Sequence, residues 1–261
     1  MPIDWIGRWL NRWLRLLDTV PRPRLGPSLY LENFDKFLSQ NDSIVFFARY
    51  VDDIVIIATK DISEIVISEL KSDKFNLEIN PKKIYKTHIL ESSSASDTFN
   101  EFDYLGYKFK IHAPCEEKNK ERKIDIAISN KKVKRIKTKM SKAVVLYLRE
   151  KNFNNFYLRM KLLTSNFSLN STKNGSLLTG IFFNYQVIND DNCLNDLNLY
   201  KTRILNGKSR IGRELQVKLP LTQNQKDKLN KLNFYSGFHL KLKVSFTKKK
   251  IITLHRCWKY V

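Results

Sequence analysis

Residues 44–59 constrain the fold most strongly, because they read as two strands joined by an acidic turn. The apolar runs Ile44–Ala48 and Ile54–Ala58 are short and rich in β-branched and aromatic residues, a composition that predicts strands. Tyr50–Asp53 would then be the turn of a hairpin. This turn contains two aspartates and no glycine, whereas two-residue hairpin loops prefer Asn-Gly or other glycine-containing pairs.

The adjacent carboxylates of Asp52 and Asp53 repel one another at the end of an otherwise apolar hairpin. A cation between them relieves this repulsion, and hard divalent ions such as Mg²⁺ bind one or two carboxylates together with the phosphate oxygens of a substrate. The pair alone leaves two interpretations open, a divalent-cation site or a solvated acidic turn.

Three segments resemble motifs of reverse transcriptases, in the order and spacing of that family. Tyr50–Asp53, preceded by Phe47-Ala48-Arg49, resembles the Tyr-x-Asp-Asp signature between two hydrophobic strands. Phe75–Lys83 resembles the Leu-x-Leu-Asn-Pro-x-Lys segment, and Phe102–Phe109 resembles the Phe-x-Phe-Leu-Gly-Tyr hairpin. The resemblance covers about residues 26–111 and is greatest to the bacterial enzymes of group II introns, retrons and antiphage defence.

The resemblance implies an RNA-directed DNA polymerase that extends a primer by two-metal-ion nucleotidyl transfer. It assigns the metal-binding and catalytic carboxylates to Asp52 and Asp53, with Asp52 as the main ligand, and proton donation to the departing pyrophosphate to Lys83. The implied cofactor is Mg²⁺, and the implied partners are an RNA template with a DNA primer, or an RNA–DNA hybrid, and deoxynucleoside triphosphates. The residues expected to contact primer and nucleotide are Tyr50, Leu105 and Gly106.

The beginning of the chain departs from the family pattern. The family has a third carboxylate on a strand upstream of a Gly-x-Pro-Gln-Gly loop, whereas here only Leu25-Gly26-Pro27 matches that loop. Asp4 and Asp18 are the only acids in residues 1–25, and neither lies in a strand-like context. We therefore expect the back half of a reverse transcriptase, with an incomplete two-ion site, a separately encoded fingers half as a partner, and weak or no polymerisation alone. The alternative function is a catalytically inactive palm–thumb remnant that acts as a nucleic-acid-binding module.

Residues 1–25 differ in composition from the rest of the chain, with five arginines and no lysine. Trp5, Trp9 and Trp13 recur at the spacing of one helix face, which predicts an amphipathic helix. Such a helix could lie on a membrane surface or a partner, or pack on the palm. The abrupt change in composition also indicates a third interpretation, in which an altered reading frame has replaced the native sequence.

Positive charge is concentrated in the later part of the chain. Residues 1–100 hold 13 Lys and Arg against 14 Asp and Glu, whereas residues 101–261 hold 34 against 12, a net charge of +22. An excess of this size indicates a polyanionic partner, most often nucleic acid. The period of apolar residues predicts a helix over Asn130–Leu148, and seven cations on it are expected to follow phosphates: Lys131, Lys132, Lys134, Arg135, Lys137, Lys139 and Lys142.

The order of predicted elements gives an α+β fold, with a partial palm of antiparallel strands and helices followed by a mostly helical thumb. The expected domains are residues 1–25, 26–113 and 114–261. The remaining predicted strands are Phe75–Ile79, Phe102–Ile111 and Lys123–Ser129, and Asn166–Gly175 is predicted to be a loop. The remaining predicted helices are 29–38 with Ser28 as its cap, one capped by Asp61 or Ser63 and ending near Lys71, 152–163, 192–205, and 223–232 capped by Thr222.

Cysteine usage and hydropathy indicate the compartment. Cys115, Cys193 and Cys257 lie far apart in the sequence, which predicts neither a zinc site nor a disulfide framework and is typical of a reducing cytoplasm. The sequence contains no apolar run of the ~18 residues that a membrane span requires. No intron-maturase or His-Asn-His nuclease segment is apparent, which favours a role in antiphage defence over retrotransposition.

Overall fold

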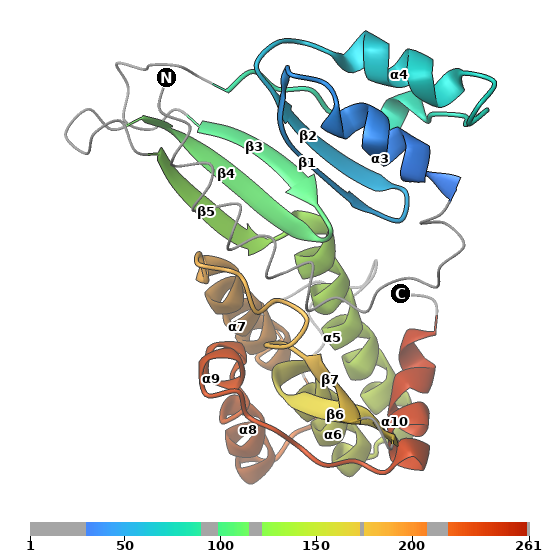
Figure 1. Ribbon diagram of the computed structural model, residues 1–261. Coiled ribbons are helices and arrows are strands. Elements are labelled where there is room, and N and C mark those ends of the chain that lie inside the picture. The colour runs from blue at the N-terminus through green and yellow to red at the C-terminus, as the bar shows by residue number, and fades with distance from the viewer. Residues whose placement is uncertain (1–29, 90–98, 115–121, 173–174, 208–218, 260–261) are drawn as a thin grey trace. The chain divides into compact units, whose positions relative to one another are not determined.

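The computed structural model describes residues 30–89, 99–114, 122–172, 175–207 and 219–259, and its fold is α+β with small antiparallel sheets (Figure 1). This agrees with the predicted fold class. The described residues form two compact units. The N-terminal unit contains those up to Leu105 and those of 110–124, and the C-terminal unit contains Gly106–Phe109 and those from Asp125 onwards. The predicted segment 1–25 and its helix lie outside the described residues.

The N-terminal unit contains the predicted hairpin. Strands β1 (Ile44–Tyr50) and β2 (Asp53–Ala58) pair antiparallel. In the sequence, helix α3 (Glu32–Ser39) precedes them and helix α4 (Ser63–Lys71) follows them. Helix α3 is the predicted helix, although it begins after residue 29, and Ser28 lies outside the described residues. The core of this unit combines apolar side chains from both helices and one face of the hairpin: Phe34, Leu38, Leu70, Phe47, Ile54 and Ile56.

The start of α4 matches the prediction in part. Ile62, the residue directly before the helix, has an apolar side chain that cannot cap it. The Asp61 carboxylate instead accepts a hydrogen bond from the Ser63 backbone N–H at 2.9 Å. Asp61 therefore satisfies one of the first backbone donors of the helix, the function that a capping residue has.

The predicted strand Phe75–Ile79 is wrong. These residues pair with no described strand, and Asn76 has a left-handed backbone, φ 44°. Phe75 is nevertheless buried, and Leu77 and Ile79 pack against the same core. The alternating sequence pattern thus reflects alternating burial of an extended segment, and it does not require a strand ladder. The short 3₁₀ helix η1 (Pro81–Lys83) follows it.

A second sheet has the strand order β3 (Phe99–Tyr104), β4 (Tyr107–Pro114), β5 (Arg122–Ile128). The strand predicted over 102–111 is interrupted by the two-residue turn between β3 and β4, at the place where the motif resembles a hairpin. Both turn residues have positive φ, 49° for Leu105 and 85° for Gly106, as a type I′ hairpin turn requires. Strand β5 confirms the strand predicted at 123–129. The division between the two units falls within β4 and β5.

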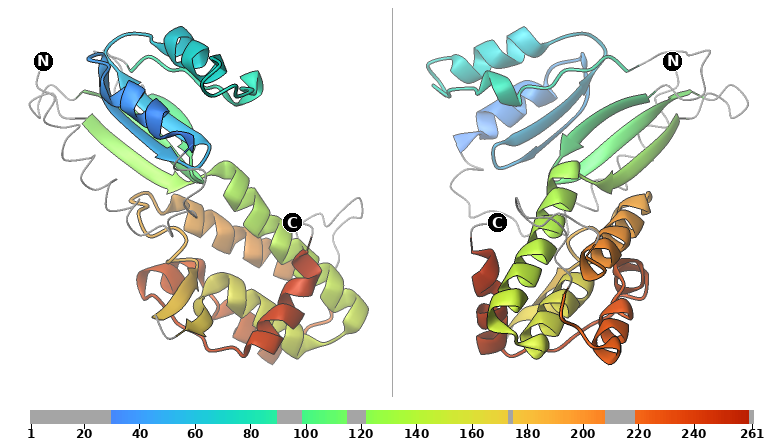
Figure 2. Two further views of the ribbon diagram at one scale, coloured as in Figure 1. Left: turned by 45° about the vertical axis from the view of Figure 1, so that its right-hand side comes forward. Right: turned by 180° about the vertical axis from the view of Figure 1, so that it is seen from behind.

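Helices α5 (Asn130–Glu150), α6 (Phe153–Thr164), α7 (Asn192–Leu205) and α8 (Gln223–Asn230) of the C-terminal unit confirm the four helices predicted there (Figure 2). The starts of α6 and α8 follow from local capping. The Asn152 side chain accepts a hydrogen bond from the third backbone N–H of α6, and Thr222 and Gln225 form a capping box at α8. Helix α5 packs against both α6 and α7.

The predicted loop Asn166–Gly175 is wrong. It lies within an antiparallel hairpin of β6 (Asn166–Thr172) and β7 (Gly175–Gly180). Its Ser, Asn and Thr content conceals the strands, because these residues are typical of turns. Asn166 is fully buried, and its side chain donates to the Gly237 carbonyl at 3.0 Å and accepts from the Phe182 N–H at 2.8 Å. One amide thus ties the hairpin to two later segments.

The segment that the sequence described only as an aromatic and basic tail contains helices α9 (Phe234–His239) and α10 (Lys248–His255) and the 3₁₀ helix η3 (Arg256–Trp258). The indole N–H of Trp258 donates to the Lys139 carbonyl at 2.9 Å, which attaches this end of the chain to α5. Over the described parts of the chain, every helix is too short or too polar to span a bilayer.

Helix α7 also carries a buried lysine. The ammonium of Lys201 donates to the carbonyls of Leu229, Asn230 and Leu232, which are the last acceptors of α8 and the residues after it. A lysine from another helix thus donates to carbonyls at the end of α8, where the helix itself supplies few donors. Burial lowers the pKa of Lys201 to about 8, whereas the three acceptors favour its charged form.

We expect Gly237→Ala to destabilise the C-terminal unit. A Cβ at this position in α9 would lie 1.7 Å from the Thr164 carbonyl oxygen, a backbone atom that cannot move aside without shifting α6. Overpacking of this kind costs about 1–3 kcal/mol or more. Denaturant unfolding of Ser236→Ala, a change of one atom at the neighbouring position, is the control. Equal unfolding midpoints for the two variants would contradict the close approach of α9 to α6.

Candidate metal and nucleic-acid sites

The acidic turn is a two-residue hairpin loop. Tyr50 pairs with Asp53 across the strands, so Val51 and Asp52 form the loop, and both aspartates are exposed. Val51 has φ 59°, a left-handed conformation that is rare for a β-branched residue. A tight hairpin turn requires a residue with positive φ, and here Val51 adopts that conformation under strain.

Arg49 holds this turn from the side of α3. Its guanidinium makes a two-pronged ion pair with Asp35, with Nε–Oδ1 at 2.8 Å and Nη2–Oδ2 at 2.5 Å, and Nη1 donates to the Val51 carbonyl at 3.2 Å. The Arg49 side chain is only 9% exposed. The hydrogen bond with Asp35 raises the pKa of Arg49 above its usual value. A permanent cation therefore fixes the carbonyl of the strained residue.

Tyr104, the last residue of β3, contacts the backbone of both strands beside the turn. Its hydroxyl lies 3.1 Å from the Asp53 carbonyl oxygen and 3.3 Å from that of Ala48. Its side chain is buried, and burial, followed by the negative charge of Asp53, raises the pKa of Tyr104. The phenol therefore stays protonated and able to donate to one of these carbonyls at a time.

A strained backbone persists only where its surroundings determine it, and such residues are concentrated at active sites and ligand clamps. Here Arg49 and Tyr104 fix the two carbonyls on either side of Asp52. The sequence motif pointed to the aspartates but not to this support. Arg49 was noted only as part of the motif, and neither Asp35 nor Tyr104 was assigned a role.

The other residues predicted for this site lie in the following places. Tyr50 is half-buried at the end of β1. Lys83 is exposed in η1, and the structure records no hydrogen bond or ion pair between it and either described aspartate. Leu105 and Gly106 form the β3–β4 turn, and the Gly106 carbonyl accepts from the Ser129 N–H at 3.0 Å.

The donor chemistry of the acidic turn fits Mg²⁺, which prefers carboxylate oxygens and completes its shell with water and substrate phosphates. Asp52 and Asp53 would hold the ion. Within the described ranges, no group of three or more His, Cys, Asp or Glu side chains is placed to bind a metal. A metal ion held by these two carboxylates would therefore need further ligands from outside the turn.

The predicted cationic helix α5 has two kinds of cation. Its buried side is formed by Ile136, Met140, Ala143, Val144 and Tyr147. On the opposite side Lys131, Lys134 and Arg135 are exposed, and Lys142 lies on the same stripe and is partly exposed. Lys131 to Lys142 spans about 16 Å at 1.5 Å per residue. This length of cationic surface is comparable to several consecutive phosphates of a nucleic-acid strand.

Three of the predicted cations lie on the flanks of α5. Lys137 lies over the ring of Tyr200 at 5.7 Å and Lys139 over the ring of Trp258 at 5.5 Å, while Lys132 passes close to Gly106. Burial, and then the charges of Arg135 and Lys132, lower the pKa of Lys139. Lys137 and Lys139 therefore pack within the unit, and the exposed stripe is the better candidate for phosphate contact.

Comparison with known proteins adds no assignment: no family model, no curated protein and no solved structure matches this chain.

We expect Asp35→Asn to loosen the acidic turn, because it leaves the buried guanidinium of Arg49 without its charged partner. Loss of charge-assisted hydrogen bonds of this kind costs about 1–3 kcal/mol. Hydrogen exchange of residues 49–54, followed by mass spectrometry, would show faster opening. Glu32→Gln on the same helix is the control, because its pair with Lys36 is solvent-exposed and contributes little. Equal exchange in both variants would contradict the role of the ion pair.

Proposed function

We propose that this chain contains the palm and thumb of a reverse transcriptase and takes part in metal-dependent addition of deoxynucleotides to a primer. The observation that carries the proposal is the pair of exposed aspartates on a strained hairpin turn whose carbonyls Arg49 and Tyr104 fix. The sequence resemblance at Tyr50–Asp53 supports the same assignment.

Nucleotidyl transfer needs positioning and charge neutralisation more than covalent participation by the protein. When bound, Mg²⁺ would lower the pKa of the attacking primer hydroxyl and neutralise phosphate charge. Asp52, in the loop itself, is the main ligand in the proposal, and Asp53, which ends the strand pairing, supports it. Because the turn is fixed before substrate arrives, its carboxylates would not have to reorganise during the reaction.

Lys83 and the β3–β4 turn have secondary roles in the proposal. Lys83 would donate a proton to pyrophosphate, and its exposed position leaves its ammonium free to reach a bound triphosphate. Leu105 and Gly106 would contact the primer, and Tyr50 would pack beneath its 3′ end. The family's third carboxylate would complete the metal site. The dispersed cysteines favour a cytoplasmic enzyme, in the context of antiphage defence.

The exposed stripe on α5 would bind the backbone of the template–primer duplex. Lys131, Lys134, Arg135 and Lys142 present cations at helical spacing, and contacts of this kind are independent of base sequence. A nucleic-acid-binding module without catalysis would use the same stripe. The two functions differ at the acidic turn, because only a polymerase needs a metal there.

We expect Asp52→Asn to abolish Mn²⁺ binding, measured by isothermal titration in the presence of an RNA–DNA hybrid and deoxynucleoside triphosphate. Asp53→Asn should weaken binding about 10–100-fold, the effect typical of a supporting residue. Asp42→Asn, an exposed aspartate in the same unit, is the control and should bind as the parent chain does. A parent chain that binds no Mn²⁺ under these conditions would favour the non-catalytic module. Equal losses for Asp52→Asn and Asp53→Asn would contradict the ranking of the ligands.

We expect the double variant Lys131→Gln/Lys134→Gln to weaken hybrid binding and to reduce the slope of log affinity against log salt by about 2, because each lost phosphate contact contributes about 1. Fluorescence anisotropy over a salt series measures this slope. Lys228→Gln/Lys231→Gln removes two exposed lysines at α8 and is the charge-matched control. The assignment to α5 would be lost if both double variants changed the slope equally.

A further inference from the structure

We propose that the C-terminal unit contains a second nucleic-acid site, which binds single-stranded nucleic acid by stacking bases on an aromatic strip beside two lysines. The strip consists of Phe183, Phe182, Phe238, His239 and Tyr235. This inference shares with the proposed function only the idea that the ligand is nucleic acid. It concerns a different surface and does not depend on the metal site.

The five rings of the aromatic strip are in continuous contact. Ring centroids lie 5.2 Å apart for Phe182 and Phe183, 5.4 Å for Phe182 and Phe238, 5.1 Å for Phe238 and His239, and 4.1 Å for His239 and Tyr235. Phe238, in the middle of the strip, is buried, whereas Tyr235 is 42% exposed and His239 is also exposed. Phe182 and Phe183, at the other end, are half-buried. The strip therefore has its open aromatic face at the end formed by Tyr235 and His239.

Two lysines lie on the other end of the aromatic strip. The Lys241 ammonium is 4.6 Å from the centroid of Phe182, and that of Lys243 is 5.9 Å from the centroid of Phe183. Both lysines are exposed. Residues 240–250 contain five lysines and no aspartate or glutamate, so phosphates can approach this segment without meeting an acid of its own. The cation–π contacts hold both ammonium groups beside the rings.

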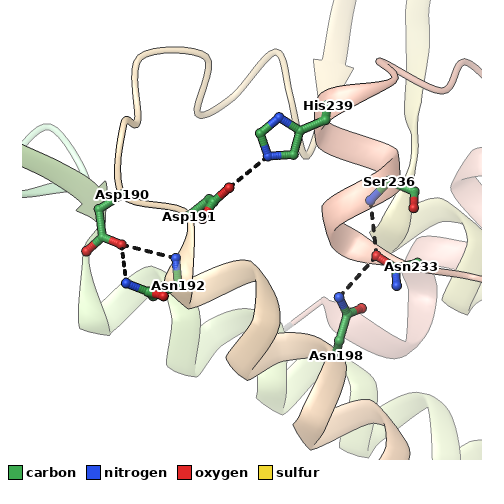
Figure 3. Close-up of polar contacts among 7 residues, drawn as sticks. All are labelled: Asp190, Asp191, Asn192, Asn198, Asn233, Ser236 and His239. Carbon is green, nitrogen blue, oxygen red and sulfur yellow. Dashed lines mark hydrogen bonds and ion pairs between the residues drawn. The ribbon is translucent and has the colours of Figure 1, made fainter.

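The helix that carries the outer rings is firmly positioned (Figure 3). His239 contacts the Asp191 carboxylate before α7 at 2.9 Å, and Asn198 of α7 donates to the Asn233 side chain at 3.1 Å. The same Asn233 oxygen caps α9 by accepting from the Ser236 N–H. Helix α9 therefore presents its rings in one orientation, which lowers the entropic cost of stacking a ligand against them. Asp191 is an acid close to the strip, and its carboxylate is in contact with the His239 ring.

The arrangement favours a single strand over a duplex. Bases of a duplex are already stacked on each other, so a ring such as Tyr235 can reach only unstacked bases. The exposed side chains on α5 are cations, Thr138, Val145 and the polar residues at its two ends, with no aromatic ring. That helix can follow phosphates but cannot stack bases, whereas the aromatic strip offers both rings and cations.

The test uses the full chain and fluorescence anisotropy with two labelled 12-nucleotide probes, oligo(dT) and an abasic oligonucleotide with the same number of phosphates. We expect the parent chain to prefer oligo(dT). Tyr235→Ala should weaken oligo(dT) binding about 5-fold or more and leave abasic binding unchanged, because a base–aromatic stack contributes about 1–3 kcal/mol. Tyr235→Phe should retain the preference. Equal affinity of the parent chain for both probes, or equal loss in both by Tyr235→Ala, would overturn the proposal.

The lysines are tested separately. Lys241→Gln/Lys243→Gln should weaken the binding of both probes. It should also reduce the slope of log affinity against log salt by about 1.4, since each single-strand phosphate contact contributes about 0.7. Lys228→Gln/Lys231→Gln is again the matched control, and an equal effect there would refute the contribution of the strip lysines. Asp52→Asn should bind oligo(dT) normally. If the parent chain binds oligo(dT) as expected but binds no Mn²⁺, the proposed polymerase is wrong and this site stands. If it binds Mn²⁺ but shows no preference for oligo(dT), only the aromatic strip is wrong.

Discussion

Arg49 and Asp35 form the interaction on which the candidate active site depends. The pair joins α3 to the end of β1, and its third donor reaches the carbonyl of Val51, the residue with the unfavourable backbone. Arg49 donates to the Val51 carbonyl, and the Tyr104 hydroxyl lies within hydrogen-bond distance of the Asp53 carbonyl. Without these donors a β-branched residue at positive φ would relax, and the hairpin would lose its two-residue loop. The ion pair is mostly shielded from water on the arginine side, so it is screened less by salt than a surface pair.

The C-terminal unit depends on buried polar groups in a comparable way. Asn166 joins the β6–β7 hairpin to the segments around Phe182 and Gly237, and Lys201 satisfies the carbonyls at the end of α8. These groups have few alternative partners inside a protein, so an arrangement that leaves them unpaired is costly. They favour one packing arrangement of the short helices after α7, because the apolar surface of these helices alone would permit several arrangements.

The sequence predicted the parts of the fold that repeat a clear period. Helix α5, with apolar residues every three or four positions, and α8, with its Thr222 and Gln225 capping box, formed as expected. Strand Phe75–Ile79 failed because alternation records which side chains are buried and says nothing about a partner strand. Hairpin β6–β7 was missed because Asn166 is held by a hydrogen bond to the carbonyl of Gly237, 71 residues away, and because Gly180 packs tightly on Ser165 and Asn166, contacts that no local pattern shows.

The candidate site was predictable only as far as its motif extends. Asp52 and Asp53 could be found from an acidic pair between apolar strands. Their support depends on Asp35, 14 residues before Arg49, and on Tyr104, 51 residues after Asp53. The seven cations of α5 were found by composition. Their division into an exposed stripe and packed flanks required Tyr200 and Trp258, which lie far along the chain.

Tyr104 has a consequence for how the acidic turn responds to a change at the end of β3. Its hydroxyl reaches the carbonyl of Asp53, and its own backbone leads directly into the β3–β4 turn at Leu105. A rigid aromatic side chain thus spans the distance between the two turns. If a ligand displaces the end of β3, the phenol must either move with it or exchange the Asp53 carbonyl for that of Ala48, which lies within reach. In the second case the phenol would keep an acceptor, and the Asp53 carbonyl would lose its donor.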